Sequence, residues 1–369
     1  MARILKYEND ERFFGCDFVL ELGEERRNTK IELLQITDMQ FIDASQRRTP
    51  DRLRIDEINA WNPKNFDVHC ANQIRTLLTQ CSPDLIFITG DAVYGSFDDS
   101  GSAFLWFVQF MDSLGIPWAL TFGNHDNESL RGVDWQCEVL EKAKNALFKR
   151  GNVTGNSNYS IGISVGGELV RMIYMTDSNG CKASADPKVE KRAGIYPDQL
   201  DKIRENARLA EKKSSSKVPA FMAFHIPTSD YLDIEAEKGY RTREREFYTI
   251  GVDTPQKDKD FGCRKEKMST MPKIDGFRDF LKDVNVDGIF CGHCHGINTV
   301  ITHSDIKWVF GLKTGQYDYH IPGQLGGTLV TLEGADFTVR HLPSLAPLSP
   351  YPGGAKMFCG FFAEDKVIL

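Results

Sequence analysis

Five short polar clusters in the sequence carry side chains that bind metal ions or transfer protons. They are Asp38, Gly90-Asp91, Gly123-Asn124-His125-Asp126, His225 and Gly292-His293-Cys294-His295. Carboxylate and amide oxygens bind hard metal ions, and a spare imidazole can transfer protons. The mixture of oxygen and nitrogen donors favours Fe, Mn or Zn over a site for Mg alone.

Each cluster follows an apolar run that is typical of a buried strand. Segments with helical spacing of apolar residues separate several of these runs. The order of strand, loop and helix is that of βαβ units, whose parallel strands bring their C-terminal ends to one edge of a sheet. We therefore expect the five clusters to meet. The predicted strands are 30–37, 84–89, 116–120, 218–224 and 286–291, and the predicted helices are 68–80, 102–114, 134–150, 198–213 and 277–284.

The rest of the chain predicts further β-structure and two polar insertions. We expect a single domain over 1–369, in which 43–66 is a surface insertion and 229–272 is a loop insertion near the site. The further strands are an edge strand or hairpin within 13–22, a pair at 159–164 and 169–176, antiparallel runs at 298–302, 306–311, 325–332 and 336–341, and a terminal strand at 358–369.

The residue types in the clusters suggest a two-metal hydrolase. A single carboxylate such as Asp91 can bridge two metal ions ~3.5–4 Å apart, which convert water into a nucleophile and hold phosphate oxygens. His125 would then be the general acid for the leaving group, and Asp126 would orient its imidazole. The alternative for residues 123–126 is a capped turn, because Asn and Asp are common turn residues.

The five clusters, in this order from Asp38 to His295, resemble the calcineurin-like metallophosphoesterase superfamily, whose pattern is D-x-H, GD, GNH(D/E), H and GHxH. Three further stretches resemble the fungal and plant group related to purple acid phosphatases: Phe224-His-Ile-Pro-Thr228, Tyr196-Pro-Asp-Gln-Leu200 and Phe310-Gly-Leu-Lys-Thr-Gly315. The resemblance implies a four-layer α/β/β/α sandwich, in which helices flank two mixed sheets.

The first cluster departs from the superfamily pattern, because Gln40 stands where the histidine is expected. The second cluster matches the GDxxY of purple acid phosphatases, in which a tyrosine binds ferric iron, and Tyr94 is the corresponding residue. The ligands implied by the resemblance are Asp38, Asp91, Tyr94 and His295 for the first metal, and Asp91, Asn124, His225 and His293 for the second.

A phenolate ligand favours Fe(III), so the expected pair is Fe(III) with Fe, Zn or Mn. In the alternative, Tyr94 is an ordinary loop aromatic, Gln40 is a weak or water-mediated ligand, and the metals are two Mn or two Zn.

The implied reaction is hydrolysis of a phosphomonoester by a metal-bound hydroxide, with a phosphorylated small molecule or a phosphoprotein as substrate. One alternative is phosphodiesterase or pyrophosphatase activity at the same metals. The other is a catalytically inactive metallophosphoesterase-like scaffold. Lys313 and Arg241 are candidate contacts for a substrate phosphate, although solvation is the simpler interpretation of either charge.

The composition and charge of the chain limit which partners and which cellular compartment we expect. The 369 residues have a net charge of −7, which argues against a nucleic-acid partner. No apolar run reaches the roughly 20 residues of a membrane span, and the segment from Met1 to Tyr7 lacks the apolar core of a signal peptide. The nine cysteines are an odd number, which favours reduced thiols. We expect a cytoplasmic protein without a membrane partner, or a secreted or vacuolar one if a leader has been removed.

Overall fold

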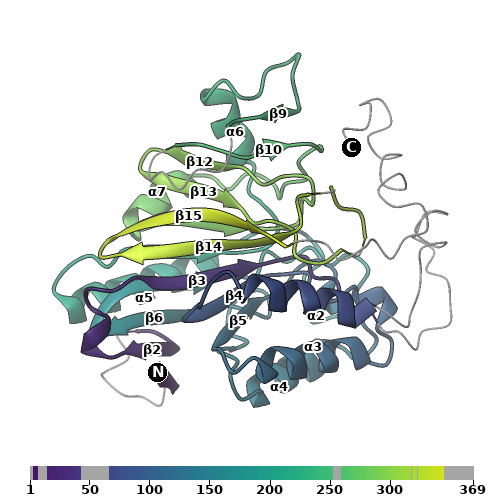
Figure 1. Cartoon of the computed structure of the whole chain (residues 1–369), viewed down its shortest axis with the longest axis horizontal. Helices are drawn as coiled ribbons and strands as arrows, with labels where there is room; N and C mark the ends of the chain where they lie inside the picture. Colours follow the sequence, from purple (N-terminus) through teal and green to yellow (C-terminus); the bar gives the residue numbers. More distant parts are fainter. Residues whose placement is uncertain are drawn as a thin grey trace.

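Two β-sheets lie face to face in the computed structural model, with helices on both outer sides (Figure 1). The structure describes residues 3–6, 15–42, 66–251, 259–316, 318–321 and 323–344. Most of the insertion at 43–66 and the whole terminal strand at 358–369 lie outside these ranges, so both stay predictions. The expected four-layer α/β/β/α sandwich of two mixed sheets is confirmed.

The smaller sheet carries three of the five polar clusters. Its central strands β3, β4 and β5 are parallel, with Leu33 opposite Leu85 and Ile86 opposite Trp118, and β14 and β15 extend it in antiparallel fashion. In spatial order the strands are β15 (Asp336–Pro343), β14 (Gly326–Glu333), β3 (Ile31–Ile36), β4 (Leu85–Thr89) and β5 (Trp118–Thr121).

The larger sheet carries the remaining two clusters. Its strands β7, β8, β11 and β13 are parallel, so that the loops after β8 and β11 leave from the same edge. In spatial order the strands are β1 (Arg3–Lys6), β2 (Phe18–Leu22), β6 (Tyr159–Val165), β7 (Glu168–Met175), β8 (Ala220–Ala223), β11 (Val286–Cys291), β13 (Ile306–Phe310) and β12 (Val300–His303). The predicted antiparallel pair at 159–176 is confirmed.

Apolar stripes on the helices explain which sheet each helix covers. In α3, Phe107 packs edge-on against Trp118 of β5 at 5.6 Å between ring centroids, and in α6, Tyr231 packs against Trp308 of β13 at 5.1 Å. The helices on the smaller sheet are α2 (Phe66–Leu77), α3 (Ser102–Ser113) and α4 (Val133–Lys142). Those on the larger sheet are α5 (Pro197–Ser214), α6 (Asp230–Glu237) and α7 (Phe277–Asp283).

Aromatic side chains fill the space between the sheets. Phe87 of β4 meets Phe290 of β11 at 5.2 Å, and Phe221 of β8 meets Phe337 of β15 at 4.7 Å. All four rings are buried, and such pairs contribute roughly 0.5–1.5 kcal/mol each beyond the area that they bury. The core thereby fixes the two sheets against each other and sets the separation of the loops at their common edge.

Two segments differ from the sequence-based expectation. The helix predicted over 134–150 ends at Lys142, because the chain then pairs with the edge strand β5: Trp118 N–H donates to Asn145 O and Leu147 N–H donates to Trp118 O. The expected loop insertion 229–272 contains α6 and a short antiparallel pair, β9 (Tyr248–Thr249) with β10 (Cys263–Arg264).

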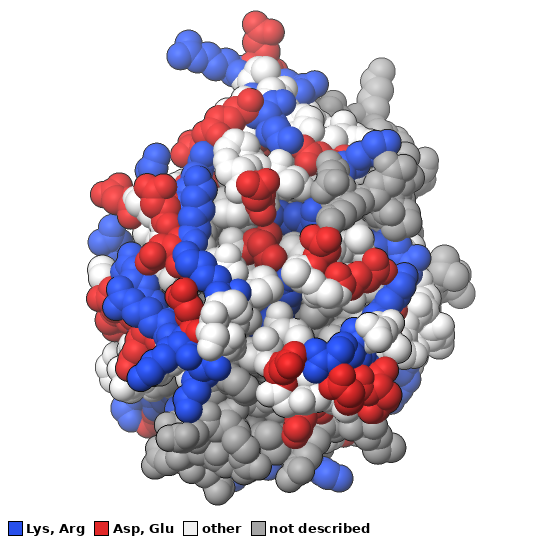
Figure 2. Space-filling model, turned by 90° about the vertical axis from the view of Figure 1, so that its left-hand side faces the viewer, with Lys and Arg blue, Asp and Glu red and all other residues white. Residues whose placement is uncertain are grey.

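Other expectations concern the surface and the thiols. The face in Figure 2 shows Lys and Arg side chains interspersed with Asp and Glu side chains. Eight cysteines in the described ranges are buried and form no disulfide, as expected for reduced thiols. Within the part of the chain that the structure describes, no helix combines the length and the apolar character needed to cross a membrane.

Candidate metal centre

The loops that follow β3, β4, β5, β8 and β11 meet at one edge of the two sheets, as predicted. Backbone hydrogen bonds join them beyond the ends of the strands: Asp38 N–H donates to Gly90 O at 3.0 Å, and Gly292 N–H donates to His225 O at 3.1 Å. The loops after β3 and β4 come from the smaller sheet and those after β8 and β11 from the larger one. The expected ligands therefore come from both layers of the sandwich.

The residues expected at the second metal position converge. Asp91, His225 and His293 each offer a ligand atom, and these atoms lie within 4.8 Å of one another. His225 Nε2 is 3.2 Å from Asp91 Oδ2 and 3.2 Å from the amide oxygen of Asn124. His225 Nδ1–H donates to the carbonyl of Thr89 at 2.7 Å. That bond fixes the tautomer, so Nε2 of the neutral ring presents a lone pair to the pocket.

Two of the residues expected at the first metal position show the same arrangement. His295 Nδ1–H donates to Tyr319 O at 2.8 Å, and His295 Nε2 faces Asp38 Oδ1 at 3.2 Å. The other oxygen, Asp38 Oδ2, accepts from Thr37 Oγ1 at 2.8 Å and from His293 N–H at 3.0 Å. In both the His225 and the His295 pairs, an imidazole lone pair faces a carboxylate oxygen. Such a pair is stable only with a cation between the two atoms, either a proton or a metal ion, so these donors fit a metal.

Tyr94, the third expected ligand at the first position, lies beside His125. The two rings stack with centroids 4.3 Å apart and an interplanar angle of 27°. The Tyr94 backbone N–H donates to Phe41 O at 2.8 Å, so the loop after β4 continues to pair with the loop after β3. Coordination by the Tyr94 hydroxyl stays a prediction.

The backbone of the centre is held in an unusual conformation. Asp38, Gln40 and Asp91 all have φ of 51°, and His293 has φ of 74°. Non-glycine residues seldom adopt positive φ, and such residues cluster at functional sites, where the surrounding structure enforces them. At Gly123 a Cβ atom would lie 2.2 Å from Asp91 Oδ1, so a glycine is required where this carboxylate passes.

The protonation states of three expected ligands also suit metal binding. Burial alone would raise the pKa of Asp38, but the charge of His295 lowers it to about 2. Burial likewise acts to raise the pKa of Asp91, and His225 and His125 together bring it below its usual range. Burial and the neighbouring His225 lower the pKa of His293 to about 3. Metal ligands must be deprotonated, and these three groups already are at neutral pH. Burial acts to lower the pKa of His225, but the charge of Asp91 raises it to about 9, so this ring would release its proton when a metal binds.

His125 lies at the pocket without being part of the ligand cluster. Its side chain is 14% exposed, and its backbone N–H donates to Asp91 Oδ1 at 2.8 Å. Burial acts to lower the pKa of His125, but the charges of Asp91 and Glu128 raise it to about 9. The protonated imidazole beside the metal ligands is the state that a general acid requires.

The carboxylate next to the His125 ring differs from the expected one. Asp126 was expected to orient this ring, but its two oxygens accept backbone N–H groups of Gly123 at 2.6 Å, Asp91 at 2.9 Å and Val93 at 3.0 Å. Asp126 thus joins the loops after β4 and β5. Glu128 Oε2 instead lies 3.1 Å from His125 Nδ1, an ion-pair contact whose angle falls short of a good hydrogen bond.

The local turn explains why Glu128 takes this place. Residues Asp126–Glu128 form a 3-10 turn, in which side chains three positions apart share one side. The Glu128 carboxylate also accepts Ser96 N–H at 3.0 Å and is 2% exposed, so its position is fixed. The spacing from His125 to Glu128 was a usable signal in the sequence, but only once a turn was assigned there.

Gln40 and Lys313 are in contact with each other. Lys313 Nζ donates to Gln40 Oε1 at 2.6 Å and to Asp38 O at 2.9 Å. Lys313 is 2% exposed, so the interpretation of it as a solvated surface charge is wrong. Burial lowers the pKa of Lys313, and the carboxylates of Asp38, Asp318 and Asp91 act in the opposite direction.

The segment 229–272 is held together by a buried ion pair and contacts the loop after β11. Arg264 of β10 donates to Glu235 of α6 at 2.6 Å, and both side chains are almost fully buried. Two residues further along, Glu266 Oε1 accepts the Gly296 N–H at 2.9 Å, directly after His295. The segment therefore braces the loop after β11.

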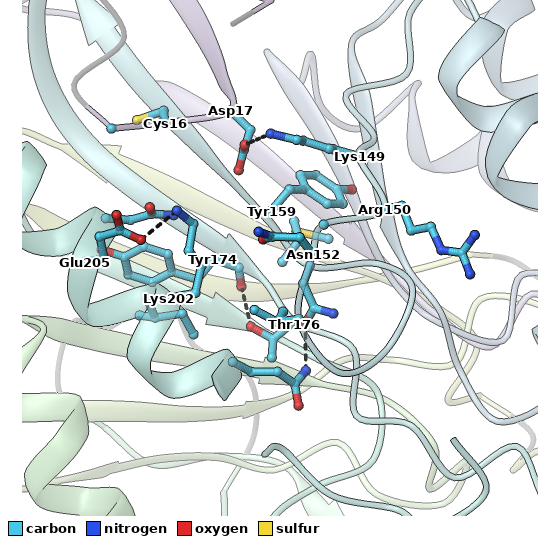
Figure 3. Close-up of a pocket in the computed structure, with 18 of the residues that line it drawn as sticks. Cys16, Asp17, Lys149, Arg150, Asn152, Tyr159, Tyr174, Thr176, Lys202 and Glu205 are labelled. Carbon is cyan, nitrogen blue, oxygen red and sulfur yellow. Dashed lines mark hydrogen bonds and ion pairs between the residues drawn. The ribbon is translucent and has the colours of Figure 1, made fainter. Parts of the chain in front are cut away.

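A cavity of about 580 Å³ lies elsewhere, between α5 and the strands β6 and β7 (Figure 3). None of the expected metal ligands lines it. Its three cationic side chains are paired: Lys149 with Asp17 at 2.6 Å, Lys202 with Glu205 at 2.8 Å, and Arg150 with Asp134. Cations that are already neutralised offer little to a phosphate group, so the edge that holds the polar clusters is the better candidate site.

Comparison with known proteins identifies the family. The family model for calcineurin-like phosphoesterases matches residues 31–296, which span every expected ligand. Phosphatase DCR2 from Saccharomyces cerevisiae is 27% identical over 65% of this chain, a match that spans 41% of its own length. A probable inactive purple acid phosphatase 14 from Arabidopsis thaliana is 24% identical over 80% of this chain and 73% of its own length.

Among solved structures, a dimetal phosphatase from Danio rerio aligns with a TM-score of 0.42 and 11% identity, over 86% of this chain and 99% of that one. The family assignment rests on the family model, which covers well over half of the sequence. The chain therefore belongs to the calcineurin-like phosphoesterase family.

Proposed function

We propose that the chain hydrolyses phosphomonoesters at a two-metal centre. The observation that carries the proposal is the pair of fixed imidazoles, His225 and His295, whose Nε2 atoms face Asp91 and Asp38 at the edge where both sheets end. The first metal would be held by Asp38, Asp91, Tyr94 and His295, and the second by Asp91, Asn124, His225 and His293. When bound, the two ions would neutralise phosphate oxygens and lower the pKa of water.

His125 would donate the proton to the leaving oxygen of the substrate. Support for this role is the raised pKa of its imidazole and its place next to Asp91 without joining the ligand cluster. Glu128 would hold the ring through Nδ1, so that Nε2–H faces the substrate. Asp126 would act on the reaction only through the shape of the two loops that it joins.

The identity of the metals follows from the role of Tyr94. If its phenolate is a ligand, the pair is Fe(III) with Fe, Zn or Mn. If it is not, two Mn or two Zn ions occupy the centre, and Gln40 contributes no strong bond. Metal analysis with a visible spectrum decides: a tyrosinate-to-iron band that disappears in Tyr94→Phe supports iron, and a colourless protein with two divalent ions excludes it.

The test of the proposed function is His125→Ala. We expect unchanged metal content and a fall in turnover of a phosphomonoester by roughly 10²–10⁴-fold, the usual contribution of a general acid. His303→Ala is the matched control, because His303 pairs with Glu237 on the surface and should leave turnover unchanged. Full activity of His125→Ala would refute its role.

Assays of the same protein with a panel of substrates distinguish the proposed activity from the two alternative functions. A preference for phosphodiesters or pyrophosphate would instead assign the chain phosphodiesterase or pyrophosphatase activity at the same metals. No turnover of any of them by fully metal-loaded protein would indicate an inactive scaffold, a class to which some relatives are assigned by name. The substrate would be a phosphorylated small molecule or phosphoprotein, acted on by a single domain.

A further inference from the structure

The side chain of Lys313 places a fixed positive charge next to the first metal position. The preceding strand β13 lies beside β11, and the loop after β11 carries His293 and His295. The Lys313 ammonium donates to the carbonyl of Asp38 and to the amide oxygen of Gln40. A buried ammonium this close to Asp38 attracts the same carboxylate as a metal ion that Asp38 binds, and it repels that ion.

The lysine cannot easily move away. The next residue, Thr314, exchanges two hydrogen bonds with Thr37: Thr314 N–H donates to Thr37 O at 2.8 Å, and Thr37 N–H donates to Thr314 Oγ1 at 3.1 Å. At Gly315 a Cβ atom would lie 1.9 Å from Met39 O, so the two backbones are in direct contact. The segment that carries Lys313 is thus attached to the loop that carries Asp38.

Lys313 also determines which end of Gln40 is available. An ammonium group only donates, so the atom of Gln40 that faces it must be the amide oxygen. The amide nitrogen then points elsewhere, and among the described residues it has no hydrogen-bond partner. An amide NH₂ is not a metal ligand. Gln40 therefore does not replace the histidine that the family has at this place, and Tyr94 is the remaining candidate for a fourth donor at the first position.

The second position does not have this gap among its donors. Asp91, His225 and His293 converge within 4.8 Å, and the Asn124 oxygen lies 3.2 Å from His225 Nε2. Its donors are complete and already close enough for one ion.

This inference rests on the two-metal centre proposed above. We propose that the two metal positions are unequal: the position of Asp91, Asn124, His225 and His293 fills first and tightly, whereas the Asp38 and His295 position binds a divalent ion weakly, because the ammonium of Lys313 stands beside it. The same charge opposes Fe(III) more strongly than a divalent ion, since the repulsion grows with the charge of the metal. Of the two metal assignments, the inference therefore favours two divalent ions.

The test is a titration of the metal-free protein with Mn²⁺. Calorimetry measures the affinities, and electron paramagnetic resonance reports whether the bound ions are isolated or coupled. We expect the first equivalent to give the spectrum of an isolated ion, and the second to bind at least about tenfold more weakly and to give the spectrum of a coupled pair. Lys313→Met keeps the length of the side chain and removes the charge. It should strengthen the weaker site by about tenfold or more and leave the tighter one unchanged.

Lys273→Met is the matched control, because it removes the same charge from an exposed side chain. It should leave both affinities unchanged. Two equal sites in the wild-type protein, or an unchanged weaker site in folded Lys313→Met, would overturn the inference alone. Binding of no Mn²⁺ at all would overturn the two-metal centre as well. The wild-type titration decides even if Lys313→Met fails to fold.

Discussion

Replacement of Glu128 by Gln tests how the proposed proton donor is held. The Glu128 carboxylate lies 3.1 Å from His125 Nδ1 and accepts the Ser96 N–H, and its side chain is 2% exposed. Glutamine retains an oxygen acceptor for Ser96 and fills nearly the same volume. The substitution therefore removes one negative charge from the His125 ring with little other change.

The expected size of the effect comes from the charges around the ring. An opposite charge within about 4–6 Å shifts a pKa by roughly 1–3 units. The charge of Asp91 acts on the pKa of His125 more strongly than the charge of Glu128 does, so we assign the charge of Glu128 the lower end, about 1 unit or ~1.4 kcal/mol. The carboxylates raise this pKa, so the acid form persists up to the raised value and is lost above it. Without Glu128 that loss begins about one unit lower.

The assay is the pH dependence of kcat for a chromogenic phosphomonoester. We expect the basic limb for Glu128→Gln to move about one unit towards lower pH, with turnover about tenfold lower on that limb and nearly unchanged on the acidic side. Glu138→Gln, which changes an exposed carboxylate on α4, is the control and should leave the profile unchanged. A basic limb at the wild-type position in folded Glu128→Gln would show that Glu128 does not set the state of His125.

Two further substitutions test the support of the centre. Arg264→Met leaves the buried Glu235 without its partner and should lower the free energy of unfolding in urea by about 3–5 kcal/mol; a loss below about 1 kcal/mol would contradict the buried pair. Gly123→Ala places a Cβ 2.2 Å from Asp91 Oδ1 and should weaken metal binding by about tenfold or more, whereas Gly194→Ala, whose Cβ would meet nothing closer than 3.4 Å, should not. Equal metal affinity in both glycine variants would refute the requirement at Gly123.

The meeting of the clusters was predictable because it depends on chain direction alone. Parallel strands bring their C-terminal ends to one edge whatever their exact register. Asp38, Asp91 and His225 each follow such a strand, so their approach could be inferred without coordinates. The outer elements were predictable for a similar reason, because apolar spacing decides whether a helix lies on a sheet.

The partner of each polar group was not predictable in the same way. Whether Asp126 or Glu128 meets His125 depends on a 3-10 turn of three residues, whose geometry a pattern of polar residues does not specify. The burial of Lys313 depends on contacts between Gly315 and Met39, which are far apart in the sequence. The general tendency of lysine to be exposed does not indicate which distant segments will cover a particular lysine.

The division of the ligands between two sheets has a consequence for synthesis of the protein. Chains emerge from the ribosome with the N-terminus first, and Asp38 and Asp91 emerge well before His225 and His295. The strand β3, which leads to Asp38, also lies between β4 and β14, and β14 is made after His295. Before His225 is made, a nascent chain holds four of the seven proposed ligands on an incomplete sheet. The proposed centre would be completed only after residue 333 has been released, which would make metal loading a late step in biogenesis.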